Sequence, residues 1–174
     1  MARANGAFSP WNDPVIIVGT AQDLEAHVGA PPGTSDWEEI TQDQIDRFAE
    51  LSGDDHWIHV DVARAAREQP DGKTIAHGLF LLSLIPRWQR QIFRIERRGA
   101  GLSYGYDRVR FTAPVPVGSR VRLSQAIVAV SRRGAATQLA LSSTVEMFGA
   151  DRPALVADGL LLIQDAPAAG RAAA

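Results

Sequence analysis

The chain has 174 residues, of which 45% are hydrophobic, so it is long enough for one well-buried core but short for two independent domains. Its 18 basic and 20 acidic residues give a formal net charge of -2, which offers no bulk electrostatic reason to bind nucleic acid or an anionic membrane. The absence of cysteine excludes disulfides, thiolate metal sites and a cysteine nucleophile. No apolar run approaches the roughly 20 residues that span a bilayer. Together these two features favour a cytoplasmic protein.

Composition divides the chain into three parts. Residues 1–35 are rich in Gly, Pro, Asn and Asp, with a short helix expected at about 20–28, and are interpreted as an N-terminal lead-in without chemistry. Residues 36–165 are expected to form the single domain. The alanine-rich residues 166–174 are expected to be a flexible tail.

A helix is predicted to begin after Thr41. The stretch Thr41 to Gln44 has the capping-box arrangement, in which the threonine side chain caps the third helical amide and the glutamine reaches back to the cap. Ile45, Phe48 and Ala49 then follow the 3.6-residue period of a buried helix face. Gly53 tolerates a left-handed backbone, and it is expected to end the helix.

The second half of the chain predicts one long helix followed by strands. Apolar residues recur at three- and four-residue steps from Gly78 to about Arg98, which indicates a helix. From Leu102 onward the apolar residues alternate, and turn sequences occur at 114–118, around Gly134 and at 149–153, with a last strand at 155–163. Helices followed by strands favour an α+β domain in which a long helix lies against a curved antiparallel sheet.

The segment Leu51 to Asp61 concentrates ionisable and aromatic residues just after a predicted helix end. A carboxylate at Asp54 and an imidazole at His59 can converge on one small molecule, deprotonate water and deliver a proton elsewhere. The structural alternative is that His59 is half-buried and bonded to the backbone, while Asp54 merely closes a turn.

This segment resembles the hydratase motif of the MaoC-like family, which runs aromatic, small residue, Gly-Asp, any residue, Asn-Pro, aliphatic residue and His. The positions that fit are Phe48, Ser52, Gly53, Asp54, Ile58 and His59. The departure is His56-Trp57, where commoner members carry Asn-Pro. Two later blocks, Thr74 to Gly78 and Tyr104 to Val121, also resemble a single-domain bacterial branch of the family and occur in the family's order.

The resemblance implies a hot-dog fold, a bent antiparallel sheet wrapped around a long central helix, usually in a homodimer with active sites near the interface. It implies (R)-specific hydration of a trans-2-enoyl-coenzyme A thioester to the (R)-3-hydroxyacyl thioester, with no metal and no redox cofactor. In that chemistry His59 is the candidate base for water and Asp54 holds the water and relays a proton. The backbone amide of Gly78, at the positive end of the central helix, is the candidate donor to the enolate oxygen. The structural alternative is a packing glycine where the helix meets the sheet.

Several other residues have weaker claims. Some hydratases place a supporting serine where this chain has Pro86, and Ser83 is more typical of a helix serine bonded to its own backbone. His77 precedes Gly78 and could orient the loop, but it is interpreted as a structural histidine. Candidate contacts for the phosphates of coenzyme A are Arg87, Arg90, Arg94, Arg97 and Arg98 on the predicted helix, and Arg108, Arg110 and Arg120 on the strands. A solvated helix face explains the helix arginines equally simply, and no single arginine is assigned.

Two other functions stay open at this point. A hot-dog thioesterase uses a carboxylate on or beside the central helix, and the predicted helix offers only Glu96 for that role. A non-catalytic protein that binds acyl thioesters would fit a loop altered at His56-Trp57.

Overall fold

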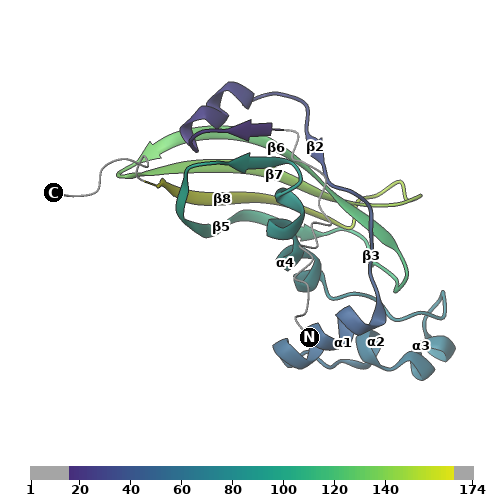
Figure 1. Ribbon diagram of the computed structural model, residues 1–174. Coiled ribbons are helices and arrows are strands. Elements are labelled where there is room, and N and C mark those ends of the chain that lie inside the picture. Colours follow the sequence, from purple (N-terminus) through teal and green to yellow (C-terminus); the bar gives the residue numbers. More distant parts are fainter. Residues whose placement is uncertain (1–15, 167–174) are drawn as a thin grey trace, which may run out of the picture.

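Four long strands dominate the computed structural model, which describes residues 16–166 (Figure 1). They are β5 (Arg98–Phe111), β6 (Arg120–Arg133), β7 (Ala136–Met147) and β8 (Leu155–Asp165). All their pairings are antiparallel, in the order β6-β7-β8-β5, and β5 forms one edge. The short strands β2 (Gly33–Thr34) and β3 (Glu38–Glu39) pair antiparallel with β6 at the other side.

Helix α4 (Gly78–Gln89) lies against the concave side of this bent sheet (Figure 1). Its residues Leu81, Ile85 and Trp88 are buried, at the three- and four-residue steps that place side chains on one helix face. They meet sheet strands in which fully buried residues alternate with partly exposed ones. The fully buried residues, which have no exposed surface, include Val121, Leu123, Leu139, Val145 and Leu155. The arrangement confirms the predicted α+β hot-dog fold.

The central helix is shorter than the sequence predicted. It ends at Gln89, not near Arg98, and β4 (Phe93–Ile95) follows after a turn in which the Ile92 amide donates to the Gln89 carbonyl. The prediction failed because Ile92 and Ile95 fit the helical spacing, whereas Phe93 and Ile95 are in fact buried on either side of an exposed residue, as in a strand.

The described part of the predicted lead-in packs on this domain. Strand β1 (Ile16–Val18) pairs in parallel with β4, and the 3-10 helix η1 (Gln22–His27) buries Leu24 completely. The helix expected at about 20–28 is therefore present as η1. Residues 1–15, and all of the predicted tail except Ala166, lie outside the described residues.

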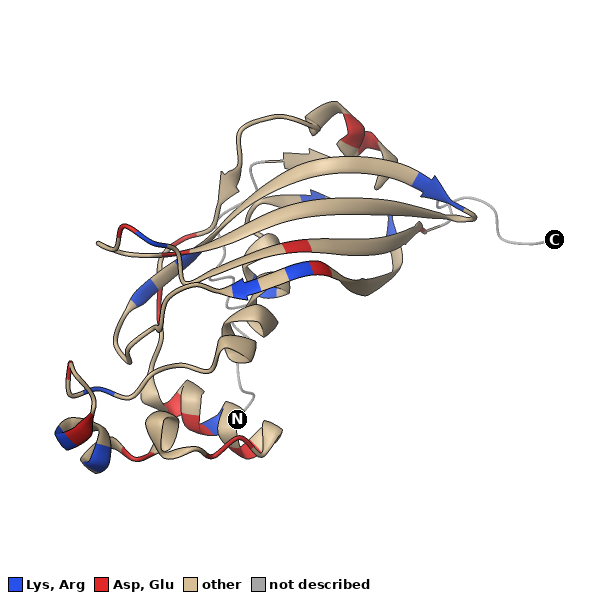
Figure 2. Cartoon of the chain, turned by 180° about the vertical axis from the view of Figure 1, so that it is seen from behind, with Lys and Arg blue, Asp and Glu red and all other residues tan. Residues whose placement is uncertain are grey.

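Three helices fill the connection between β3 and α4: α1 (Gln42–Ser52), α2 (Trp57–Val60) and α3 (Val62–Glu68). The Thr41 capping box is present, since the Thr41 hydroxyl accepts from the Gln44 amide and the Gln44 side chain accepts from the Thr41 amide. Figure 2 shows both signs of charge intermixed on these helices and at the strand ends. Within residues 16–166 no helix is long and apolar enough to cross a membrane.

Candidate active site

The turn after α1 sets the position of Asp54. Gly53 adopts φ +76°, a left-handed conformation that glycine accepts without strain, and its amide donates to the Ala49 carbonyl. The Ser52 hydroxyl donates to the Phe48 carbonyl at 2.7 Å and accepts from the Asp54 amide at 3.3 Å. The small residue and the Gly-Asp pair of the motif thus end the helix and leave Asp54 exposed at the start of the next loop.

His59 lies on the single turn of α2, and its side chain is only 8% exposed. Its Nδ1 is 2.7 Å from the Ile75 carbonyl oxygen. Because a carbonyl only accepts, Nδ1 carries the proton, and Nε2 keeps its lone pair. The side chain of Gln42 donates to the His59 carbonyl at 2.8 Å and accepts from the Thr74 hydroxyl, which ties α2 to α1 and to the chain before α4.

Burial lowers the pKa of His59 below the ordinary histidine value, because the charged ring would lose its hydration. The bond to the Ile75 carbonyl acts in the opposite direction and favours the charged form, while the neighbouring His77 lowers the pKa further. The net effect is a lowered pKa, so the ring is neutral at pH 7 and available as a base.

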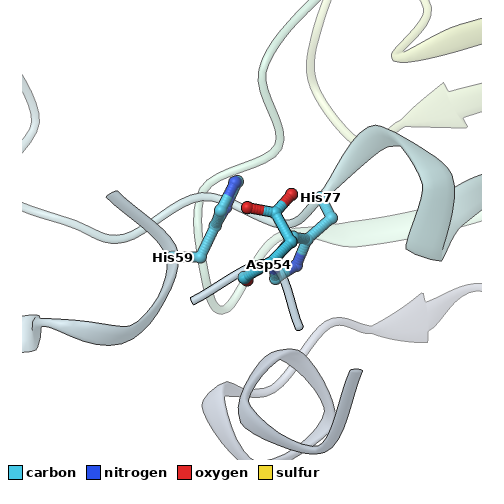
Figure 3. Close-up of side chains that lie close together, drawn as sticks. All are labelled: Asp54, His59 and His77. Atoms are coloured by element: carbon cyan, nitrogen blue, oxygen red, sulfur yellow. The ribbon is translucent and has the colours of Figure 1, made fainter. Parts of the chain in front are cut away.

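His77 is the N-cap residue of α4 and contacts both candidate groups (Figure 3). Its ring stacks on that of His59, with centroids 3.7 Å apart and planes 24° apart. Its Nε2 donates to the backbone carbonyl of Asp54 at 2.8 Å, and its Nδ1 is buried without a partner. Phe48 packs on the His77 ring at 5.1 Å, which gives the aromatic position of the motif a structural role.

The sequence interpretation of His77 as a structural histidine missed this double contact with the pair. The signal available was its place directly before Gly78, which puts it at the start of the central helix. The contact with Asp54 joins residues 23 positions apart, and no local pattern predicts it.

Gly78 opens α4, and the amides of a helix's first turn have no partner within the helix. A pocket of ≈ 270 Å³ is lined by His59, Gly78 and Leu81 on one side and by residues 111–115 on the other. A side chain at Gly78 would clash, since its Cβ would lie 2.6 Å from the ring of Phe111. The glycine therefore allows the close approach of this pocket wall to the helix N-terminus.

The structure thus brings the three predicted site residues into one region. A carboxylate oxygen of Asp54 and one ring nitrogen each of His59 and His77 lie within 4.8 Å of one another, and His59 shares the pocket with Gly78. The sequence did not predict Phe111 as part of the pocket wall, although Phe111 lies in the block from Tyr104 to Val121 that resembles the family.

Asp54, His59 and His77 are also the residue types that bind metal ions. Their arrangement does not suit a shared ion, because the in-plane lone pairs of two stacked imidazoles run in nearly parallel planes and do not converge. The geometry fits a pair of acid/base groups with a supporting ring better than a metal centre.

The departure from the motif at His56-Trp57 leaves the loop ordered by other contacts. The His56 carbonyl accepts from the His59 amide at 2.9 Å, and the guanidinium of Arg64 lies 4.2 Å above the Trp57 ring. A cation over an aromatic face is attracted by the ring's electrons, so Arg64 on α3 helps to hold α2.

The proposed arginine row along the central helix was wrong. Arg87 lies on α4 and pairs with Glu38 at 3.0 Å, but Arg94, Arg97 and Arg98 lie beyond the end of the helix on or beside β4 and β5. Glu96 also lies after β4. Helix α4 therefore carries no carboxylate of the kind expected for a hot-dog thioesterase.

Fold and site together define a hot-dog protein with a carboxylate and an imidazole next to the N-terminus of its central helix. Residues 23–146 match the family model described as MaoC like domain. The chain belongs to this family and is a hydro-lyase, an enzyme that adds or removes water, like the 3-hydroxyacyl-thioester dehydratase it is similar to.

Curated relatives and solved structures agree with this assignment. The chain is 46% identical over 140 residues to 3-hydroxyacyl-thioester dehydratase Z of Mycobacterium tuberculosis. The alignment covers 80% of this chain and 92% of the relative. It is 40% identical over 147 residues to nodulation protein N of Rhizobium leguminosarum, covering 83% and 91%. An unliganded R-hydratase from Pseudomonas aeruginosa has the same fold, with a TM-score of 0.68 at 21% identity over 85% of this chain and 88% of that one.

Proposed function

We propose that this protein is an (R)-specific 2-enoyl-coenzyme A hydratase that adds water reversibly and syn to a trans-2-enoyl thioester. The observation that carries the proposal is the placement of neutral His59 beside the Asp54 carboxylate and in the wall of the pocket that Gly78 also lines. The 46% identity to a 3-hydroxyacyl-thioester dehydratase supports the thioester substrate.

Each group meets one need of the reaction. Attack of water at the β-carbon pushes charge onto the thioester oxygen, so the site needs a base, a proton for the α-carbon and an oxyanion donor. His59 Nε2 takes the proton of the attacking water, whose hydroxyl bonds to the β-carbon. Asp54 holds that water and, with His59, passes the proton on to the α-carbon, so one water is consumed in total.

The Gly78 amide supports the developing enolate. It lies at the first turn of α4, where the helix dipole adds partial positive charge, and it lines the same pocket as His59. A hydrogen bond that strengthens as the oxygen gains charge lowers the barrier, not merely the energy of binding.

The group that carries the acyl chain is either coenzyme A, as proposed here, or an acyl carrier protein. The relative's name specifies only a thioester, which is compatible with coenzyme A or with an acyl carrier protein. We propose coenzyme A. The test is an assay with crotonyl-coenzyme A and with crotonyl-acyl carrier protein, in which loss of enoyl absorbance measures turnover and chiral analysis identifies the product. Turnover of crotonyl-coenzyme A to the (R)-alcohol supports the proposal. Turnover of the acyl carrier protein substrate alone contradicts it.

We also propose that the protein works as a homodimer joined through β5. This 14-residue edge strand pairs only with β8 among the described residues, and it exposes Leu102, Tyr104 and Phe111. An open edge with exposed apolar side chains favours pairing with another strand. Since Phe111 also lines the pocket, a partner along β5 would lie close to the site.

A further inference from the structure

A second cavity lies deeper between α4 and the sheet. It measures ≈ 20 Å³ and is lined by Ile85, Pro86 and Gln89 of the helix and by residues of all four long strands. Most of its lining is apolar, but five polar side chains reach it, those of Gln89, Ser103, Tyr106, Gln125 and Ser143. Polar side chains at such a position need a partner.

In two of these side chains, one polar atom has no hydrogen-bond partner. Gln125 is 3% exposed; its Nε2 donates to the Ser143 hydroxyl at 2.8 Å, while its Oε1 is buried and unbonded. The Nε2 of Gln89 is buried and unbonded as well. Within residues 16–166 only four buried side-chain polar atoms have no partner, and two of them belong to this one small cavity. Burying an unbonded polar group opposes folding, so the cavity has a donor and an acceptor ready for a ligand.

The cavity follows the candidate active site along the same helix face. Leu81 lines the first pocket and Ile85 the second, and residues four apart on a helix are neighbours, separated by a rise of about 6 Å. Along β5, Phe111 lines the first pocket and Tyr106 the second. The two spaces therefore follow one another along α4, in the direction away from Gly78.

We propose that this cavity binds a hydroxyl group at the far end of the acyl chain, so that the preferred substrates are hydroxylated acyl thioesters. The proposal rests on the proposed function, since it takes Gly78 as the thioester position. A hydroxyl can accept from Gln89 Nε2 and donate to Gln125 Oε1 at once, which an alkyl end cannot do. The volume suits one water-sized group, since a cavity of about 15 Å³ already holds a water.

Binding of unreactive thioesters tests the subsite separately from catalysis. The full-length protein is titrated by calorimetry with saturated ω-hydroxyhexanoyl-coenzyme A and hexanoyl-coenzyme A, and with the matching octanoyl pair. We expect the hydroxylated member of at least one pair to bind about tenfold more tightly or better, as two added hydrogen bonds imply. Equal affinity within both pairs, tighter binding of the plain members, or binding of none would overturn the proposal.

Variants then locate the preference. The variants Gln125→Leu and Gln89→Leu each remove one hydrogen-bond partner of the hydroxyl, so each should lose or reverse the preference for the hydroxylated thioester. Gln89 is only half-buried, so Gln89→Leu still tests the subsite if Gln125→Leu does not fold. The matched control is Gln138→Leu on β7, a glutamine outside the cavity, which should keep the preference. A preference that survives both cavity variants places hydroxyl recognition elsewhere and rejects the subsite.

The outcome is distinguishable from failure of the hydratase proposal. A hydroxyl preference without turnover of any enoyl thioester keeps the subsite and rejects hydration. Turnover of crotonyl-coenzyme A without a hydroxyl preference keeps hydration and rejects the subsite.

Discussion

The protonation state of His59 follows from its surroundings and sets the expected pH dependence. A base must be unprotonated to act, and burial lowers the pKa of His59 below the ordinary histidine value of 6.5. We therefore expect the acid limb of kcat/KM for hydration to be centred below pH 6.5. A pH profile of the wild type checks this, and an acid limb centred above 6.5 would contradict the role assigned to His59.

The same shift links folding to pH. The unfolded chain binds a proton at His59 more readily than the folded chain does, so this residue's contribution to stability is present above pH 6.5 and is lost as the pH falls through the lower folded pKa. Chemical denaturation of wild type and His59→Gln between pH 7.5 and pH 5 measures it. The wild type should lose more unfolding free energy over that range; equal losses would show that His59 is not the group responsible.

His77 is predicted to position the pair without touching substrate. His77→Ala removes both the bond to the Asp54 carbonyl and the stacking on His59, and it should lower kcat by up to about 100-fold with a smaller change in KM. His77→Gln can still donate to Asp54 and should recover part of that loss. Because His77 contributes to the lowered pKa of His59, the acid limb should move to higher pH in the alanine variant; an unmoved limb would leave His77 a purely structural role.

Local chemistry was predictable at the residue scale, but contacts across the chain were not. Asp54, His59 and Gly78 could be chosen because a motif carries them. The partners of His77 and Gln125 could not be predicted, since they lie 23 and 18 positions away and come together only through the fold.

At the scale of elements, α1 presents the Asp54 turn, so its stability bears on the site. Thr41→Ala removes the capping hydroxyl and should lower the unfolding free energy by about 1 kcal/mol. Thr41→Ser keeps a hydroxyl and should cost little. Urea denaturation of both variants measures the difference, and an alanine variant as stable as the serine one would mean that the cap contributes nothing in this chain.

The strands could be predicted more reliably than the end of the central helix. Period-two alternation in 120–133 and 136–147 has a single interpretation, and the structure confirms it. The stretch after Gln89 has two, because apolar residues three apart suit a helix while Phe93 and Ile95 also suit a strand. Pairing with β1, far away in the sequence, decides in favour of the strand.

At the scale of the whole molecule, the open edge of β5 predicts self-association. Leu102→Glu places a charge on an apolar position of that strand that is 66% exposed, and it should shift the protein from dimer to monomer at micromolar concentration. Sedimentation analysis of wild type and variant checks this. A wild type that sediments as a monomer, or a variant that stays dimeric, would reject the interface along β5.

The most direct test of the account is hydration of crotonyl-coenzyme A by wild type, Asp54→Asn and His59→Gln, with each variant's fold checked by circular dichroism. The account predicts turnover to the (R)-alcohol by the wild type and a loss of at least about 100-fold in kcat in each folded variant, as expected for removal of a general acid or base. Wild-type activity retained in either folded variant would contradict the assignment of Asp54 and His59 as the reacting pair.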